Sequence, residues 1–370
     1  MKLCRPNLAA AASRAASGSM KAWLAESPTI GITKINHPIP TLKRPNDVLI
    51  RVKAASVNTI DTKMVQGYGD ELLGIWHKAA NCNSAASRFP MIPGRDCSGT
   101  VESVGPSVHS LRPGDEVIAV VPAIEQGAHA EFTVTPDTCC APKPRNLSFT
   151  EAASVPYVAC TSWASLVTFA RMNPRKKPSE RVLINGGSGG LGTMAIQMLK
   201  SWGVEKVVAT CSKNSFELVR SLGAIPIDYA APNATDLLIE LAPFEVILDC
   251  VDSELAKWSD HVMGTWRNCV HVSVVSPLMS DTDRYGVITG LFSTAAKHFN
   301  RAYKSHMQGR WYTYAYFMPN QECLLQVSKL LEEGKIKPIV EKVYKFDEMP
   351  AAYEKVSYLH GKGKTVVEFD

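Results

Sequence analysis

The chain has 370 residues, which is more than one ordinary domain needs and suits two domains. Hydrophobic residues make up 45% of it and charged residues 20%, so packed cores can form, and no stretch reaches the eighteen uncharged apolar residues that a membrane span requires. The formal net charge of +5 is too small to indicate nucleic-acid binding.

The first nineteen residues differ in composition from the rest of the chain. They contain Lys2, Arg5 and Arg14, many alanines and serines, and no acidic residue; the first acidic residue is Glu26. This composition is typical of a mitochondrial transit peptide, so we expect residues 1–19 to direct the protein to mitochondria. The alternative is an N-terminal tail with no targeting role.

Short alternating runs between residues 20 and 154 predict strands. The runs are MKAWLAE, VLIRVKAASV, GTVESVGP, DEVIAVV and AEFTVT, and Pro, Gly and Asp turns separate them. Residues 69–90 have no clear period, and we expect a long loop there, with at most a helical turn. This part of the chain predicts a mostly antiparallel β domain.

From residue 155 onward, strand patterns alternate with helix patterns. The strands are ERVLING, VEKVVATCS, FEVILDCV and NCVHVSVVS, and the first helices are GGLGTMAIQMLKSWG and NSFELVRSLGA. This alternation predicts a parallel, doubly wound sheet of the α/β class. An amphipathic helix, QECLLQVSKLLEEGKI, closes the region near residue 335. Residues 336–370 return to strand–helix–strand, and KTVVEFD is expected to pair back into the first domain.

A glycine-rich loop between a strand and a helix is the strongest single motif. Gly187, Gly189 and Gly192 fit the pattern GxGxxG directly after RVLI. Glycines allow a tight turn and a close approach to a pyrophosphate, and the helix N-terminus offers unpaired N–H groups and a partial positive charge. The motif therefore predicts dinucleotide binding; the alternative is an ordinary glycine-rich turn.

The end of the next strand bears on which dinucleotide is bound. NAD-binding sheets usually carry an acidic residue there for the ribose 2′-hydroxyl. This chain has Thr210-Cys211-Ser212-Lys213, with no acid, and Tyr229 follows the third strand. A 2′-phosphate would be attracted by Ser212 and Lys213, so the sequence predicts NADPH over NADH. For Lys213 alone, a solvated surface lysine is the alternative.

Cysteine and histidine patterns indicate no metal centre and no hydrolase site. The ten cysteines are scattered, without a CxxC pair or a Cys/His cluster at zinc spacing. We expect reduced thiols rather than a disulfide framework. The histidines are dispersed, and none forms a recognisable Ser/His/Asp arrangement.

Together, these motifs resemble a known family. The chain is similar to zinc-independent medium-chain dehydrogenases/reductases of the quinone oxidoreductase branch, and within it to the mitochondrial reticulon-interacting protein group. The resemblance implies a GroES-like catalytic domain, residues 20–154 and 336–370, around a Rossmann NADP-binding domain, residues 155–335, with the nicotinamide between them. The phrases that carry it are ASVNTIDTKMVQGYG, FPMIPGRDCSGTVESVG, LRPGDEVIAVVP, EAASVPYVACTSWASL, INGGSGGLG, GKGKTVVEF and the FMP at Phe317–Pro319.

The resemblance also implies which residues contact the cofactor. Ser188, Gly189, Gly190 and Leu191 would hold the pyrophosphate; Ser212, Lys213 and Tyr229 would meet the 2′-phosphate side. Thr161 would approach the nicotinamide side, and Cys250 and Val251 would lie where the fourth Rossmann strand ends against the cofactor. His360, Gly361 and Lys362 would reach the cofactor from the C-terminal tail. The group has Ala and Arg where this chain has Gly361 and Lys362.

Zinc-dependent members of the family differ from this chain at their metal ligands. They place Cys where it has Asn58 and His-Glu where it has Arg95-Asp96, and they carry a four-cysteine lobe that is missing here. Without these ligands a tetrahedral zinc site cannot form, so we expect no metal. Asn58 and Tyr68 are the candidates that polarise a substrate carbonyl, and the alternative is that both brace the wall of the site.

Two further features of the sequence can each be interpreted in two ways. Asp61 is expected to have a structural turn role rather than that of a general acid. The aromatic run of Trp311, Tyr312, Tyr314, Tyr316 and Phe317 either lines a pocket for a flat ring or forms a buried strand with one exposed face.

Two functions are compatible with these patterns. The first is NADPH-dependent reduction of a quinone or an enone, for which the resemblance implies a role in coenzyme Q metabolism in the mitochondrial matrix. The second is a cofactor-binding interaction protein with a reticulon-type partner and little catalysis. A homodimer is compatible with both.

Overall fold

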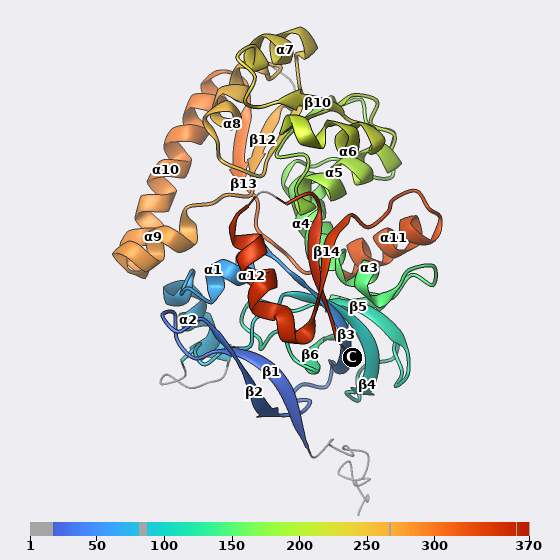
Figure 1. Cartoon of the computed structure of the whole chain (residues 1–370). Coiled ribbons are helices and arrows are strands. Elements are labelled where there is room, and N and C mark those ends of the chain that lie inside the picture. Colours follow the sequence, from blue (N-terminus) through green and yellow to red (C-terminus); the bar gives the residue numbers. More distant parts are fainter. Residues whose placement is uncertain (1–17, 81–86, 266–267, 360, 370) are drawn as a thin grey trace, which may run out of the picture.

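The computed structural model describes residues 18–80, 87–265, 268–359 and 361–369. The expected transit peptide lies outside these ranges, apart from its last two residues. The described chain forms two large sheets and a two-stranded sheet, and the two large sheets belong to different halves of the molecule (Figure 1). The domain boundaries that we propose, near residues 154 and 336, separate these two sheets.

The parallel sheet has six strands in the order β10-β9-β8-β11-β12-β13, and every neighbouring pair is parallel. In chain order this is the 3-2-1-4-5-6 arrangement of a doubly wound sheet, as expected. The inner strands are buried along their whole length because helices cover both faces. The strands are β8 (Val182–Asn185), β9 (Val207–Cys211), β10 (Ile225–Asp228), β11 (Val246–Asp249), β12 (Val270–Ser273) and β13 (Trp311–Tyr314).

Helices connect these strands and cover the sheet. Helix α5 buries Ile196, Met198 and Leu199 completely, which anchors the glycine loop that precedes it. The expected late amphipathic helix is confirmed as α11, which buries Cys323 and Leu324. The helices of this half are α5 (Gly190–Ser201), α6 (Phe216–Ser221), α7 (Ala234–Leu241), α8 (Glu254–Trp258) and α11 (Gln321–Glu332).

The second sheet draws its strands from both ends of the chain. The expectation for KTVVEFD is confirmed, because β15 pairs antiparallel with β3 across more than 300 residues of sequence. Only β14 and β15 pair in parallel within this otherwise antiparallel sheet of the described chain. Its strands are β3 (Asp47–Val57), β4 (Asp96–Val104), β5 (Glu116–Val120), β6 (Phe132–Pro136), β7 (Cys140–Pro142), β14 (Val340–Lys345) and β15 (Lys364–Glu368); β1 (Ser19–Ala25) and β2 (Ile32–Pro38) form the separate hairpin.

The expectation of a long loop over residues 69–90 is wrong for its first half, which forms helix α2 (Asp70–Ala80). Leu72 and Leu73 are buried, with acidic residues in the first turn and His77 and Lys78 in the last turn, which suits the helix dipole. The apolar stripe is only two turns long, which is why its period is hard to see. The other helices of this half are α1 (Thr59–Met64), α3 (Phe149–Ala153) and α12 (Met349–Ser357), whereas α4 (Pro156–Trp163) packs on α5 in the Rossmann half.

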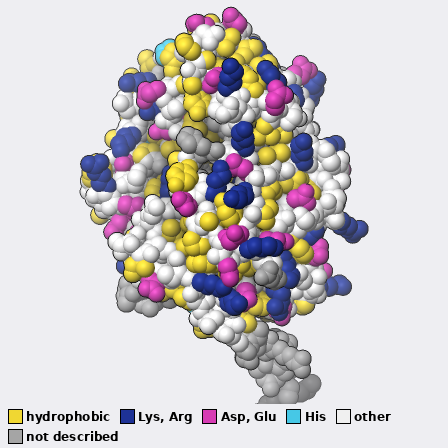
Figure 2. Space-filling view, in the orientation of Figure 1, with side chains coloured by type: hydrophobic (Ala, Val, Ile, Leu, Met, Phe, Trp, Pro, Cys, Tyr) yellow, Lys and Arg dark blue, Asp and Glu magenta, His cyan; other side chains and the backbone are white. Residues whose placement is uncertain are grey.

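Two helices between β12 and β13 have no counterpart in the elements expected from sequence. They are α9 (Leu278–Tyr285) and α10 (Val287–Met307), and α10 runs along the outer edge of the molecule beside β13 (Figure 1). Figure 2 shows Lys and Arg side chains interspersed with Asp and Glu on the face it presents, in keeping with the small net charge. No helix of the described residues is long and apolar enough to cross a membrane.

Candidate functional site

The glycine loop joins β8 to α5. Gly186 has a φ of +93°, and a Cβ on Gly192 would lie 2.2 Å from the Gly186 carbonyl oxygen, so both positions require glycine. A Cβ on Gly189 would meet only that same oxygen, at 3.8 Å, so the loop is open on this side. Gly189 is the N-cap of α5 and provides no side-chain cap, which leaves the first N–H groups of the helix able to bind an anion.

Three residues expected at the adenosine lie around the end of β9. Ser212 directly follows the strand and is half-buried, and Lys213 is exposed. Tyr229 donates its backbone N–H to the Cys211 carbonyl at 3.3 Å, and its side chain is 51% exposed. The structure thus brings Ser212, Lys213 and Tyr229 to one end of two neighbouring strands.

The C-terminal tail reaches the same region. Lys362 donates from Nζ to the Asn214 carbonyl at 2.7 Å, which places a second cation beside the turn that holds Lys213. Gly361 lies next to Glu341, whose Oε2 would be 3.1 Å from a Cβ at that position. His360 lies outside the described residues, so its expected contact stays a prediction.

The tail also lies directly against the glycine loop. Gly363 donates its N–H to the Ser188 carbonyl at 2.9 Å and forms a parallel bridge with Gly189. The stem of Lys364 covers Gly190 so closely that a Cβ there would lie 2.6 Å from Lys364 Cδ. The loop is therefore held between its own sheet and the last strand of the other domain. Leu191 follows in the first turn of α5, half-buried.

A buried polar network continues from Lys364 into the GroES-like half. Lys364 Nζ donates to Asn58 Oδ1, and Asn58 Nδ2 donates to Asp96 Oδ1 at 2.9 Å and to Ser56 Oγ at 3.4 Å. Ser56 and the Tyr157 N–H also donate to the Asp96 carboxylate, at 2.6 and 3.1 Å. Because both amide hydrogens of Asn58 have partners inside the protein, this pattern favours the alternative that Asn58 braces the site.

Asp61 and Arg95 form a second buried pair beside this network. Their closest atoms, Asp61 Oδ1 and Arg95 Nε, are 3.8 Å apart, and Asp61 Oδ2 accepts the Asn58 N–H at 2.8 Å as part of a capping box. Burial raises the pKa of Asp61, although the Arg95 charge opposes this. Arg95 donates to the carbonyls of Pro122 and Glu125. These contacts support the structural turn role expected for Asp61.

At the positions where the resemblance places zinc ligands, Asn58 and Asp96 are hydrogen-bonded to each other, and Arg95 is paired with Asp61. Among the described residues, no group of three or more His, Cys, Asp or Glu is placed to hold a metal ion. The eight cysteines in the described ranges form no disulfide, and burial raises the pKa of the Cys250 thiol.

Tyr68 lies at the edge of this region, near α9 and the aromatic run. It is half-buried, and burial raises the pKa of its phenol, with Asp283 and Tyr316 as smaller causes. Phe317 stacks on Tyr157, with ring centroids 4.4 Å apart. The end of the aromatic run therefore approaches the candidate site.

The start of the aromatic run behaves as its alternative predicted. Trp311 to Tyr314 form the edge strand β13, in which Tyr312 is buried and Trp311 is 59% exposed. This part of the run belongs to the sheet rather than to a pocket.

Three further residues expected to contact the cofactor, Thr161, Cys250 and Val251, lie close to the glycine loop or to the Lys364 network. Cys250 donates its N–H to the Asn185 carbonyl at 3.0 Å, and Val251 is 49% exposed beside Gly186. Thr161 is almost buried, and its hydroxyl donates to the Tyr157 carbonyl at 2.7 Å. Cys250 and Val251 therefore adjoin the phosphate loop, while Thr161 adjoins the network.

Lys364 is the residue that sequence reasoning missed. Its side chain is 7% exposed, and burial lowers the pKa of its ammonium, opposed by the carboxylates of Asp96 and Asp61. The sequence feature that could have pointed to Lys364 is its position as the first residue of an apolar strand, whose next three residues are buried. Its meaning depends on contacts with residues 306 positions away, which no local pattern reveals.

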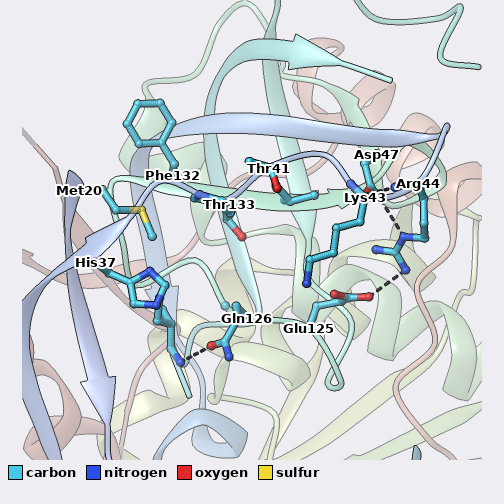
Figure 3. A pocket seen from close by; sticks show the side chains of 14 residues that line it. Met20, His37, Thr41, Lys43, Arg44, Asp47, Glu125, Gln126, Phe132 and Thr133 are labelled. Atoms are coloured by element: carbon cyan, nitrogen blue, oxygen red, sulfur yellow. Dashed lines mark hydrogen bonds and ion pairs between the residues drawn. The ribbon is translucent and has the colours of Figure 1, made fainter. Parts of the chain in front are cut away.

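A separate pocket of about 80 Å³ lies in the GroES-like half, beside β1 and β2. Figure 3 shows Arg44 between Asp47 and Glu125, with both ion pairs at 2.8 Å. The residues that line this pocket belong to neither the glycine loop nor the Lys364 network, so we do not include it in the site.

Comparisons with known proteins agree with this architecture. A family described as "Alcohol dehydrogenase GroES-like domain" matches residues 44–145, and one described as "Zinc-binding dehydrogenase" matches residues 222–367. The solved structure of the quinone oxidoreductase from Coxiella burnetii is 27% identical, with a TM-score of 0.75, and the match covers 95% of this chain and 99% of that one.

Curated relatives are more similar in sequence. "Reticulon-4-interacting protein 1, mitochondrial" of Caenorhabditis elegans is 57% identical over 96% of both chains. "NAD(P)H oxidoreductase RTN4IP1, mitochondrial" of Homo sapiens is 38% identical over 90% of this chain and 84% of that protein. The chain therefore belongs to the medium-chain dehydrogenase/reductase family of oxidoreductases.

Proposed function

We propose that the chain is an NADPH-dependent oxidoreductase that reduces a quinone or an enone without a metal ion. The observation that carries this proposal is the open glycine loop at the uncapped start of α5, held against Gly363 and Lys364 of the other domain. The names of the relatives and of the solved quinone oxidoreductase support the same reading.

The residues around the glycine loop and the end of β9 suit a dinucleotide that carries a 2′-phosphate. Ser188 to Leu191 would bind the pyrophosphate through backbone N–H groups, and Ser212, Lys213 and Lys362 would meet the 2′-phosphate. Asp228 is the nearby acid on β10, opposite Cys211 in register, and its Oδ1 accepts the Ala230 N–H at 3.0 Å. That carboxylate is engaged in its own turn, which supports NADPH over NADH.

When bound, the cofactor supplies the hydride. The protein's part is to orient the substrate and stabilise negative charge on its oxygen. Lys364 has one hydrogen-bond acceptor among the described residues, Asn58, so its remaining N–H groups can donate to that oxygen. Tyr68 is the second donor that we propose, at the aromatic edge of the site.

Nucleotide titration of the full-length chain, followed by an NADPH-oxidation panel of quinones and enones, tests this proposal. We expect NADPH to bind at least about tenfold more tightly than NADH, since a 2′-phosphate gains charge-assisted hydrogen bonds.

Gly189→Ala should fold normally, because its Cβ has room, yet should weaken NADPH binding at least about tenfold. Gly74→Ala, in open space on α2, is the matched control. Equal affinity for the two nucleotides would refute NADP specificity, and binding without turnover would refute the reductase.

The finer parts of the function also belong to this proposal. We propose a location in the mitochondrial matrix and a role in coenzyme Q metabolism; the names of the relatives support a mitochondrial location. The name of the nematode relative motivates the alternative of a reticulon-type partner with little catalysis. Failure of every quinone and enone in the panel, with NADPH still bound, would favour that alternative. Sedimentation of the purified chain tests for a homodimer.

A further inference from the structure

Helix α10 exposes its large apolar side chains and buries its small ones. Its fully buried residues are Gly290, Thr294 and Ser305. Helices on the surface of water-soluble proteins normally show the reverse arrangement, with the apolar face inward. The exposed apolar residues are Ile288, Leu291, Phe292, Phe299, Tyr303 and Met307, with exposures of 44% to 74%.

These side chains form one continuous stripe. The positions 288, 292, 299, 303 and 307 are separated by four or seven residues, which places them on one face of a helix. Exposed alanines at 295 and 296 fill the gap in the stripe, and Phe299 stacks on Tyr303 with centroids 5.9 Å apart. With 21 residues the helix is about 30 Å long. We call this surface the α10 stripe.

The charged residues of α10 itself are all basic, although Lys297 and Arg301 face Asp281 and Asp260 of neighbouring elements. No acidic residue occurs between Asp283 and Glu322, a segment that contains α10 and β13. Lys297 and Lys304 are exposed on the helix itself, and Lys297 contacts Asp281 of α9 at 2.7 Å. The basic residues of the segment are Arg284, Lys297, Arg301, Lys304 and Arg310.

We propose that the α10 stripe docks the protein on the surface of a membrane that contains anionic lipid. A helix with Phe and Leu on one face, Lys on its flank and no acid lies in the interface of such a bilayer, where the lipid provides both acyl chains and phosphates. A second copy of the chain fits less well, because a two-fold axis through the stripe would bring two basic segments together. The net positive charge that remains on the segment, with Lys304 exposed, therefore favours the lipid surface.

The position of the stripe connects it to the candidate site. Helix α10 lies on the outside of the molecule, and α9 links it to the loop after α1 (Figure 1). Asp283 of α9 accepts the N–H groups of Gly69 and Glu71, at 2.6 and 3.2 Å, beside Tyr68. A docked protein would hold this edge of the site close to the lipid. Docking itself does not depend on the proposed reductase activity.

Vesicle flotation of the full-length chain tests the proposal. We expect the protein to float with phosphatidylcholine vesicles containing about one third phosphatidylglycerol, to bind pure phosphatidylcholine much more weakly, and to lose binding as salt rises. The double variant Phe292→Ser/Phe299→Ser should bind the anionic vesicles at least about tenfold more weakly, since two apolar side chains no longer enter the lipid. Ile239→Ser, which changes an exposed apolar residue on α7, is the control.

The outcomes separate the possible occupants of the stripe. The N-terminal segment is the same in all variants, so its cations cannot account for a difference between them. Absence of vesicle binding, or equal binding by the double variant, would overturn the proposal. A fall in molecular mass of the double variant, measured by light scattering without lipid, would instead assign the stripe to a second copy. NADPH titration of the same samples tests the proposed function independently.

Discussion

The two halves of the molecule surround a buried histidine with opposite electrostatic environments. In the GroES-like half, His129 is fully buried, its Nδ1 lies 2.9 Å from the Tyr353 hydroxyl and its Nε2 3.2 Å from the Ser56 carbonyl. Burial lowers the pKa of His129 to about 4, so it is neutral near pH 7. A ring that accepts from the tyrosine and donates to the carbonyl carries its proton on Nε2.

In the Rossmann half, His271 is equally buried but lies between two carboxylates. Its Nδ1 is 2.6 Å from Asp260 Oδ1, and its Nε2 is 3.9 Å from Asp249 Oδ2. Burial lowers the pKa of His271, but the two carboxylates outweigh this effect and raise it overall. The two carboxylates therefore favour the protonated form of His271, and Arg301 lies 3.5 Å from the second oxygen of Asp260.

The difference follows from what else is buried nearby. In the GroES-like half, Arg95 and Lys364 already balance the buried carboxylates of Asp61 and Asp96, so His129 serves as a neutral hydrogen-bonding residue. In the Rossmann half no lysine contacts Asp249 among the described residues. One half therefore depends on a lysine from the C-terminal strand, and the other on a histidine that can lose its charge.

The largest expected effect comes from removing that lysine. Lys364→Met leaves Asp96 and Asp61 buried with less compensating charge, so we expect the free energy of unfolding to fall by about 3–5 kcal/mol. Urea unfolding measures this change. Lys329→Met, on the surface of α11, should change stability by less than about 0.5 kcal/mol.

A second variant distinguishes loss of charge balance from loss of packing. Adding Asp96→Asn to Lys364→Met should restore part of the stability, because it removes one buried carboxylate while keeping its shape. A double variant as unstable as the sum of the two single variants would show that the lysine acts by packing alone.

His129 should make the GroES-like half sensitive to acid. The pKa of His129 is lower in the folded than in the unfolded state. Below the pKa of the unfolded state, the unfolded chain therefore binds more protons than the folded chain, and the free energy of unfolding decreases as the pH is lowered. Relative to His129→Gln, which cannot titrate, the wild type should lose roughly 2 kcal/mol between about pH 7 and pH 5. Urea unfolding at both pH values checks this, and parallel pH profiles of the two proteins would contradict it.

The sequence predicted the glycine loop of the Rossmann half but not the Lys364 network of the GroES-like half. The loop from Gly186 to Gly192 and the turn at Ser212 and Lys213 follow from local backbone chemistry, so their places at the strand ends were predictable. The Lys364 network joins residues 306 positions apart, and only the folded sheet brings them together. Helix α10 was not predicted, although its apolar residues recur at helical spacing; only the fold shows that this face lies outward rather than in the core.

The smallest of the three effects concerns His271 and should have the opposite sign to that of His129. Its pKa is raised in the folded state, so its contribution is complete below the unfolded value near 6.5 and is lost as pH rises through the folded value. We expect His271→Gln to cost about 1.5 kcal/mol near pH 6, the loss of a hydrogen-bonded charge, and progressively less at alkaline pH. Denaturant unfolding of wild type and variant from about pH 6 to pH 9 measures the convergence. If the gap between them were constant, His271 would be neutral in the folded protein, and the contrast between the two halves would lie in hydrogen bonding rather than in charge.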